Sequence, residues 1–204
     1  MLQQFKLMVI SSPTDLPGEI SNIIQLFENG LQHFHLRKPM WEPWQAEEFL
    51  RAIPAIYHPH IVLHSNFLFT NKFPLMGIHL NEENKKNLHL FEKYKVVSGA
   101  FHTIEEIREN TVPYRYIFLS PVFDSISKPG YQSTFEPKQL QLDLKELRSR
   151  RNQPPAIIAL GGISVDNIEL TRQLGFSGAA VIGSVWNEVH PLKAFLVLQR
   201  CIPL

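Results

Sequence analysis

Short apolar segments alternate with amphipathic helical segments eight times along this chain of 204 residues. Such alternation is typical of βα units around a parallel sheet. An open doubly wound sheet shows the same alternation, but eight evenly spaced units, the last two each ending in a glycine signal, favour closure into a barrel. We therefore predict a single-domain α/β fold over residues 1–204, a (β/α)8 or TIM barrel.

The expected elements are placed by apolar periodicity and by the residues that start and stop them. Apolar runs predict strands over residues 5–10, 33–37, 61–64, 77–80, 96–101, 116–120, 156–160 and 179–182. Helical spacing predicts helices over 19–29, 44–57, 85–94, 138–149 and 191–199, and a short helix near Phe67. A further helix should begin after Thr103, because Glu106 three residues later completes a capping-box pattern.

Charge and cysteine content narrow the classes of function. Lysine and arginine number 20 against 19 acidic residues, so no global field favours nucleic acid or an acidic membrane surface. The single Cys201 rules out an intramolecular disulfide framework and fits a reducing compartment. No stretch approaches the roughly 18 apolar residues of a membrane helix, and the start shows no leader pattern. We expect a soluble, cytoplasmic protein without nucleic-acid or membrane partners.

Two glycine signals near the end of the chain indicate phosphate binding. Leu160-Gly161-Gly162-Ile163-Ser164 follows one apolar run, and Gly183-Ser184 follows the next. In a (β/α)8 barrel these are the ends of the seventh and eighth strands, where loops and a short helix hold a phosphate. The alternatives are a tight turn and a helix N-cap, and both can hold while backbone N–H groups bind phosphate. Gly161, Gly162, Gly183 and Ser184 are therefore expected to bind a phosphorylated small molecule.

The strand over 33–37 carries polar side chains on one face. His33, His35 and Arg37 alternate with Phe34 and Leu36, so the two sets face opposite sides of the sheet. Arg37 would hold a phosphate or carboxylate at the mouth of the barrel, with His35 below it and His33 in a structural position. The alternative is a buried arginine paired with an acidic neighbour.

Histidines also stand at or near the ends of three further strands, at His64, His79 and His102, and could converge with His35. A metal cluster is one interpretation, but barrel strands spread such side chains around a ring, and no carboxylate or cysteine accompanies them at a familiar ligand spacing. We therefore expect no metal site. Acid–base chemistry by His35 or His102 is favoured, with a satisfied core histidine as the alternative, and His64 and His79 would line the substrate site.

The segment 121–137 is longer than ordinary connections after a barrel strand, and such loops tend to carry the site. Ser125, Ser127 and Lys128 precede Gly130 and could direct several donors at an anion. A solvated turn rich in serine, proline and glycine is the alternative. Asp124 is better explained as a turn cap than as an acid or base.

Six segments in one order resemble the thiamine phosphate synthase and TenI superfamily over nearly the whole chain. They are Phe34-His-Leu-Arg37, Gly77-Ile-His-Leu80, 98–102 with Glu106, Ser120-Pro-Val-Phe with Ser127-Lys128, Leu160-Gly-Gly-Ile163 with Asn167, and 178–184. The resemblance implies a TIM barrel of thiamine biosynthesis. It also implies that Arg37 and Lys128 hold diphosphate, and that a thiazole phosphate is held by Ser125, Ser127, Gly162, Ile182 and Gly183.

The sequence departs from the synthases at the positions that would bind diphosphate and magnesium. Their Gln-x-Arg-x-Lys is His35-Leu-Arg37-Lys-Pro39 here, and their two magnesium aspartates fall at Ser65 and Asn84. Neutral side chains at these two positions would bind Mg²⁺ poorly unless the substrate diphosphate supplied most of the coordination. TenI proteins instead aromatise a thiazole carboxylate phosphate without metal or diphosphate. The histidine proposed as their acid or base falls at Pro121, so His35 or His102 would have to substitute.

The sequence therefore predicts a thiamine-pathway enzyme that binds a thiazole phosphate, with TenI-like tautomerase chemistry favoured and no cofactor. The alternative is thiamine phosphate synthase, which joins hydroxymethylpyrimidine diphosphate to thiazole phosphate with magnesium. A non-catalytic regulator that keeps the phosphate site and a sugar-phosphate barrel enzyme are further alternatives. Trp41, Trp44 and Trp186 could form the subunit interface of a homo-oligomer or pack in the core.

Overall fold

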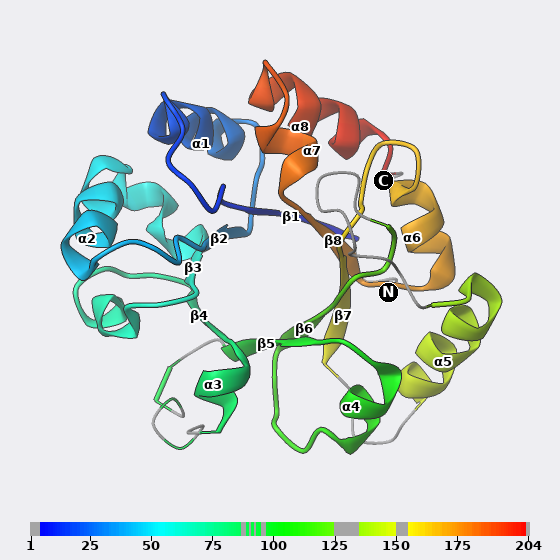
Figure 1. Ribbon diagram of the computed structural model, residues 1–204. Coiled ribbons are helices and arrows are strands. Elements are labelled where there is room, and N and C mark those ends of the chain that lie inside the picture. Colours follow the sequence, from blue (N-terminus) through cyan, green and yellow to red (C-terminus); the bar gives the residue numbers. More distant parts are fainter. Residues whose placement is uncertain are drawn as a thin grey trace.

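A computed structural model describes residues 5–86, 89, 91, 93–94, 97–124, 135–149 and 155–202 of the chain. Eight strands form one closed parallel barrel in sequence order, which confirms the predicted α/β fold (Figure 1). The strands are β1 (Lys6–Ile10), β2 (Phe34–Leu36), β3 (Ile61–Leu63), β4 (Gly77–Leu80), β5 (Val97–Phe101), β6 (Tyr116–Leu119), β7 (Ala156–Leu160) and β8 (Gly178–Val181). The barrel closes between β1 and β8, where Lys6 stands opposite Gly178 and Val9 opposite Val181.

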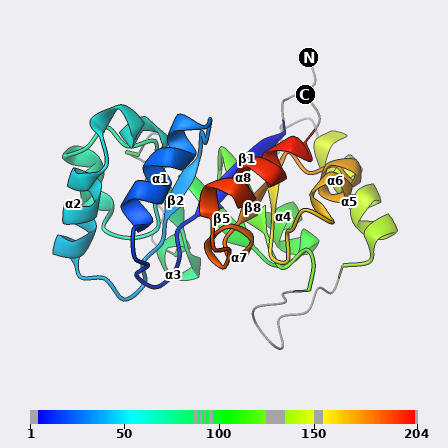
Figure 2. The same ribbon diagram turned by 90° about the horizontal axis from the view of Figure 1, so that it is seen from above.

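Helices follow the strands and surround the barrel (Figures 1 and 2). The α-helices are α1 (Glu19–Glu28), α2 (Pro43–Ala52), α3 (Glu82–Lys85), α4 (Ile104–Glu109), α5 (Pro137–Ser149), α6 (Ile168–Leu174), α7 (Gly183–Trp186) and α8 (Pro191–Arg200). Two 3-10 helices cover Ala55–His60 and Phe67–Asn71. α1 packs beside α8, and α5 packs beside α6. Among the described residues, no helix is long and apolar enough to cross a membrane.

Helix boundaries differ from the predicted ones where local signals compete. α2 ends at Ala52 rather than at residue 57, because Ile53 precedes Pro54 and the position before a proline disfavours helical geometry. α6 has no counterpart among the predicted helices, and Gly175, with a φ of 104°, ends it. Only the short α3 is found near the start of the helix expected over 85–94, and residues 87, 88, 90 and 92 lie outside the described chain.

The start of α4 follows the predicted capping pattern in part. The Thr103 hydroxyl accepts a hydrogen bond from the Glu106 backbone N–H at 3.1 Å, as a capping box requires. The Glu106 carboxylate accepts in return from the backbone N–H of His102 at 2.7 Å, one residue earlier than Thr103. This return bond fixes the backbone of His102 at the end of β5.

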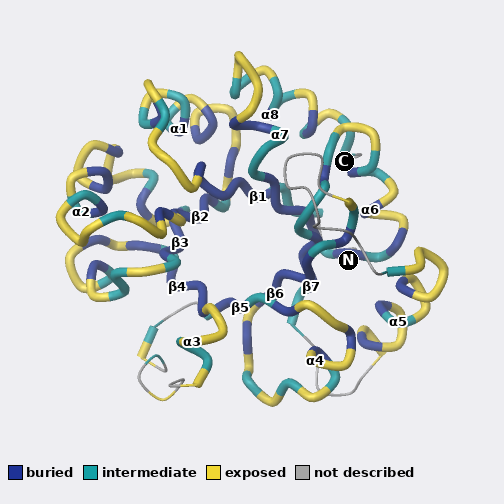
Figure 3. The backbone as a smooth tube through the Cα atoms, in the orientation of Figure 1, coloured by how far each residue is buried: buried dark blue, intermediate teal, exposed yellow. Residues whose placement is uncertain are grey.

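Alternation along the strands divides the buried side chains into two clusters. The inner cluster fills the barrel and contains Met8, Ile10, Tyr116, Phe118, Ile158 and Ala180. Residues between these in sequence, such as Val9 and Ile117, belong to the larger cluster between the barrel and the helices. Figure 3 shows buried strands ringed by helices whose outer sides are exposed. In β2, Phe34 and Leu36 join the outer cluster, so the polar face of that strand points into the barrel.

Candidate active site

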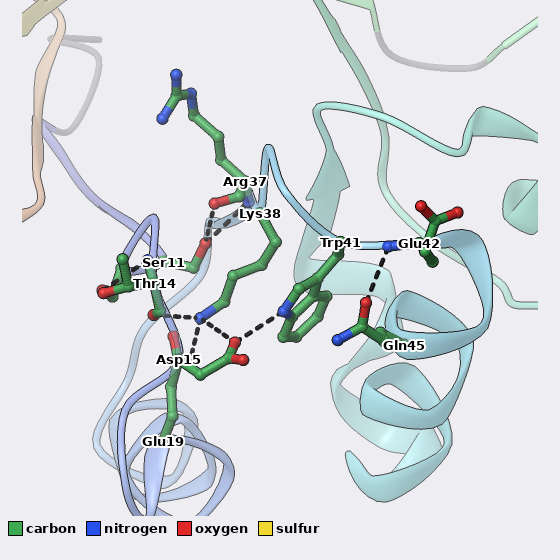
Figure 4. A network of polar contacts seen from close by, with 10 residues as sticks. Ser11, Thr14, Asp15, Glu19, Arg37, Lys38, Trp41, Glu42 and Gln45 are labelled. Carbon is green, nitrogen blue, oxygen red and sulfur yellow. Dashed lines mark hydrogen bonds and ion pairs between the residues drawn. The ribbon is translucent and has the colours of Figure 1, made fainter.

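Arg37 stands directly after β2, and a serine that follows β1 holds its backbone. The Ser11 hydroxyl accepts a hydrogen bond from the Arg37 backbone N–H at 2.8 Å and donates one to the Arg37 carbonyl at 3.0 Å. The guanidinium is exposed and points away from the surrounding polar network (Figure 4). None of the ion pairs among the described residues involves Arg37. Its side chain is therefore placed where an anion can reach it.

The buried cation with an acidic partner is not Arg37 but its neighbour Lys38. The Lys38 ammonium bonds the Glu19 carboxylate and donates to the Thr14 carbonyl at 2.8 Å, and the two charged side chains are only 2% and 4% exposed. It also lies 4.9 Å from the centre of the Trp41 ring. Burial raises the pKa of the Glu19 carboxyl, and Lys38 opposes that shift. Lys38 thus fastens the loops after β1 and β2 together (Figure 4).

Three of the histidines at strand ends converge, namely His35, His64 and His79. His35 Nδ1 and His64 Nε2 are 2.9 Å apart and share a hydrogen bond. The rings of His64 and His79 stack with their centroids 4.2 Å apart. The expectation that the barrel would spread these side chains around a ring fails for them, because β2, β3 and β4 are consecutive neighbours in the sheet.

Hydroxyl groups of the barrel interior anchor this cluster. The Tyr116 hydroxyl lies 2.8 Å from His35 Nε2, and Ser98 Oγ lies 2.9 Å from His79 Nδ1. The register of β4 and β5 places Ser98 beside His79. His35 has no exposed surface, whereas His64 is only partly buried. An acid–base role for His35, which the sequence predicts, would therefore have to act through His64.

Burial keeps the clustered imidazoles uncharged. Desolvation lowers the pKa of His79 to about 3, with smaller contributions from the positive charges of Lys85 and Arg37. Burial also holds the pKa values of His35 and His64 well below the usual range for histidine. At neutral pH the cluster presents nitrogen lone pairs and aromatic faces rather than positive charge.

His102 and His33 lie outside the cluster. His102 is exposed, and its Nδ1 is 2.8 Å from the Ser120 carbonyl, which ties the end of β5 to the end of β6. His33 packs edge-on against Tyr116 with ring centroids 6.3 Å apart, and burial lowers its pKa to about 4. The predicted acid–base role of His102 stays a prediction, and His33 has the packed position expected of a structural residue.

Paired glycines after β7 allow the loop after β6 to come close. Gly161 and Gly162 have φ values of 91° and 65°, in the left-handed region that favours glycine. A Cβ at Gly162 would lie 2.5 Å from the Asp124 carbonyl oxygen, and the Phe123 N–H donates to the Gly161 carbonyl at 3.2 Å. The predicted anion donors farther along this loop, Ser125, Ser127 and Lys128, lie outside the described residues.

The loops after β7 and β8 are joined to each other and leave backbone donors free. The Ser184 hydroxyl donates to the Ile163 carbonyl, so this side chain is engaged between the loops. The Asn167 side chain accepts from the Ser164 N–H at 2.9 Å and donates to the Gly162 carbonyl at 2.8 Å. Within the described chain, no acceptor is found for four backbone N–H groups, those of Gly162, Ile163, Gly183 and Ser184. Donors of this kind suit a phosphate.

The fold is that of the (β/α)8-barrel enzymes, which build their active sites at the carboxyl ends of the strands. The exposed arginine, the buried imidazoles and the paired glycines stand at or beyond these strand ends. A family model described as thiamine monophosphate synthase matches residues 7–185. The chain belongs to this family, as the sequence resemblance predicts, and it is an enzyme of the thiamine pathway.

Individual relatives agree over the full length. A thiamine-phosphate synthase of Flavobacterium psychrophilum is 23% identical over 202 residues, which cover 96% of this chain and 98% of the relative. The solved structure of a thiamine phosphate pyrophosphorylase from Bacteroides thetaiotaomicron is 33% identical, with a TM-score of 0.82 and 97% of each chain covered. The pyrophosphorylase of Pyrococcus furiosus, 17% identical with a TM-score of 0.79 and coverage of 98% and 96%, shares the fold.

The residues present do not fit the magnesium that the resemblance implies for synthases. Ser65 offers an exposed hydroxyl and Asn84 a neutral amide. Asn84 stands between Glu83 and Lys85 in α3, and the Lys85 ammonium bonds the Glu82 carboxylate and the Ala100 carbonyl. Mg²⁺ requires hard and preferably anionic oxygen ligands in octahedral geometry. These two positions therefore form no magnesium site, and no step is assigned to that ion.

Proposed function

We propose that the protein joins hydroxymethylpyrimidine diphosphate to thiazole phosphate and releases diphosphate, which yields thiamine phosphate. The observation that carries the proposal is the full-length similarity to proteins named thiamine-phosphate synthase and thiamine phosphate pyrophosphorylase. It favours the synthase over the TenI-like tautomerase, which the sequence places first because the metal and diphosphate groups of the synthases are replaced while the phosphate site is kept. The order of the two functions is therefore reversed.

In the proposed reaction the bond between the pyrimidine methylene carbon and the diphosphate oxygen breaks, and the oxygen keeps the electron pair. The thiazole nitrogen then donates its lone pair to the methylene carbon, and the new carbon–nitrogen bond forms. Arg37, with a fixed backbone and an exposed guanidinium, would bind the departing diphosphate, together with Lys128. The thiazole phosphate would be held by the free N–H groups after β7 and β8, with Ser125 and Ser127.

The imidazole cluster suits a reaction in which positive charge develops on the pyrimidine. A protonated histidine near this carbon would oppose ionisation, and burial keeps His79 and His64 unprotonated at neutral pH. His64 and Phe118 both stack on His79, with centroids 4.2 and 4.9 Å away, so the partly exposed His64 ring has the aromatic face that can meet the pyrimidine. Aromatic faces attract cations. These residues would line the pyrimidine part of the site.

Growth complementation tests the proposed function. A bacterial strain that lacks its own thiamine phosphate synthase is expected to grow without added thiamine when it expresses this protein. Arg37→Ala should weaken the rescue, whereas Arg51→Ala, which removes a surface partner of Glu47, should leave it intact. Absence of rescue by soluble wild-type protein would contradict the proposal.

One observation favours the tautomerase as a second candidate, namely the neutral Ser65 and Asn84 at the magnesium positions. That reaction needs only a phosphate site and an acid–base group, for which His102, exposed at the end of β5, is the candidate. Aromatisation of thiazole carboxylate phosphate that is lost in His102→Ala would support it. Thiazole phosphate binding without turnover in either assay would support the non-catalytic regulator.

A further inference from the structure

The imidazoles of His35, His64 and His79 bring three potential ligand atoms together. One ring nitrogen from each residue lies within 4.8 Å of the other two. Among the described residues, this is the one group of histidine, cysteine and acidic side chains that could together hold a metal ion. The three residues come from consecutive strands, and no carboxylate belongs to the group.

The hydrogen bonds around the cluster engage the nitrogens that face away from its centre. His79 Nδ1 bonds Ser98 Oγ, and this hydroxyl donates onward to the Ile78 carbonyl at 3.4 Å. His79 therefore carries its proton on Nδ1 and keeps a lone pair on Nε2. His35 Nε2 faces the Tyr116 hydroxyl, which can accept a hydrogen bond as well as donate one. His35 can thus hold its proton on Nε2 and free Nδ1, the atom that faces His64 Nε2.

This arrangement matches how proteins prepare imidazole ligands. A metal-binding histidine usually donates its second ring N–H to an oxygen, which fixes the tautomer and the ring orientation. Ser98 and Tyr116 provide that oxygen for His79 and His35. Imidazole nitrogen suits zinc, copper and nickel, whereas magnesium prefers oxygen.

We propose that His35, His64 and His79 form a binding site for one divalent transition-metal ion, Zn²⁺ by ligand type, with a fourth position open towards the mouth of the barrel. Three histidines with one open position are a known ligand set for zinc. The proposal concerns metal binding alone. Because a cation in the cluster would oppose the positive charge that develops in the proposed synthase reaction, it applies to the protein without its pyrimidine substrate.

Two features of the cluster shape the expected site. The rings of His64 and His79 are stacked at an interplanar angle of 20°, so one must rotate before both can point at a shared ion. His64 is the one to move, because it follows the end of β3 and is only partly buried, while His79 is tied to Ser98. The positive charges of Arg37 and Lys85 act on the cluster and favour an ion that carries an anionic fourth ligand, such as hydroxide or a phosphate oxygen.

Metal titration of the whole protein tests the proposal. Chelator-treated protein is titrated with Co²⁺, followed by visible absorption, and with Zn²⁺, followed by calorimetry. We expect one ion per chain, Co²⁺ bands typical of a four-coordinate site, and displacement of Co²⁺ by Zn²⁺. His64→Ala should weaken binding at least tenfold. Ser98→Ala, which removes the hydroxyl that anchors His79 but none of the three imidazoles, should weaken it about tenfold. His190→Ala, at an exposed position before α8, should change nothing.

Thermal melting of each variant in the presence of chelator establishes that it is folded. Absence of saturable binding at one ion per chain would overturn the proposal. Equal affinity of wild type and His64→Ala would overturn it as well, because the ion would then be bound elsewhere and the cluster would be a hydrogen-bonded part of the core. His79→Ala should also weaken metal binding. If this variant does not fold, the weaker binding expected of Ser98→Ala tests the role of His79 in its place.

Discussion

Replacement of Gly162 by alanine tests whether the close approach of two loops holds the proposed phosphate site together. Gly162 has a φ of 65°, and an added Cβ would lie 2.5 Å from the Asp124 carbonyl oxygen and 2.6 Å from that of Phe123. Gly18 provides the matched control, because its φ is 70° and no atom lies within 4 Å of an added Cβ there. The two substitutions share the backbone strain and differ in the steric contact.

The expected magnitudes follow from this difference. A left-handed conformation costs an alanine roughly 1 kcal/mol, so Gly18→Ala should lower the free energy of unfolding by about that amount. Gly162→Ala adds overpacking against backbone atoms, which costs about 1–3 kcal/mol. Relief of the contact would also weaken the hydrogen bond from the Phe123 N–H to the Gly161 carbonyl, worth about 1 kcal/mol. We expect Gly162→Ala to be destabilising by about 2–4 kcal/mol more than Gly18→Ala.

Urea unfolding of wild type, Gly18→Ala and Gly162→Ala, monitored by circular dichroism, measures the difference. A soluble Gly162→Ala should also lose affinity for thiazole phosphate, while Gly18→Ala keeps it. Losses of unfolding free energy that agree within about 0.5 kcal/mol for the two variants would refute the argument. The loops after β6 and β7 would then be able to separate at little cost.

Three further predictions concern buried and exposed charges. The pKa of His79 is about 3 in the folded protein, whereas histidine in the unfolded chain titrates near 6.5. The free energy of unfolding should therefore fall as the pH drops below about 6.5. Between pH 7.5 and 5.0, His79 should account for about 2 kcal/mol of this fall. Urea unfolding at both pH values, with chelator present, should show that His79→Gln loses about 2 kcal/mol less unfolding free energy between these pH values than the wild type does. An equal loss in both proteins would contradict the low pKa of His79. Lys38→Met leaves the Glu19 carboxylate buried without its partner and should cost about 3–5 kcal/mol in the same assay, part of which the double variant with Glu19→Gln recovers. Arg37→Ala should lower kcat/KM for the diphosphate substrate about 10–100-fold in steady-state assays. Its unfolding free energy should stay within about 0.5 kcal/mol of the wild-type value. Unchanged kcat/KM together with a clear loss of unfolding free energy would make Arg37 a structural residue.

The barrel could be predicted from the sequence because most of its strands are short apolar runs, and the strand over 33–37 alternates polar and apolar residues, patterns that need no distant information. The limits of β4 and β7 agree with the predicted ranges, and β8 differs by one residue at each end. The short helix α6 escaped prediction because seven residues show too little periodicity, whereas α7 is the short helix expected at the end of the eighth strand. Gly175 and the spacing of Ile168, Thr171 and Leu174 were the available signals for α6.

The side chains of the site were harder to predict, because their environment depends on residues distant in sequence. Lys38 and Arg37 are neighbours, and only the position of Glu19 decides that Lys38 is buried while Arg37 is exposed. The convergence of His35 and His64 depends on the neighbouring positions of β2 and β3, which spacing along the chain does not reveal. The sequence favours the tautomerase because of the substituted diphosphate and magnesium positions, whereas the similarity of the whole chain favours the synthase.

The central claim, that the protein makes thiamine phosphate, is tested most directly by product analysis. Purified protein is incubated with hydroxymethylpyrimidine diphosphate and thiazole phosphate, with and without added Mg²⁺, and thiamine phosphate and diphosphate are quantified together. Thiazole carboxylate phosphate alone is the parallel substrate. We expect thiamine phosphate and diphosphate in equal molar amounts. Aromatisation of the thiazole carboxylate phosphate without any thiamine phosphate would contradict it and would identify the enzyme as a tautomerase.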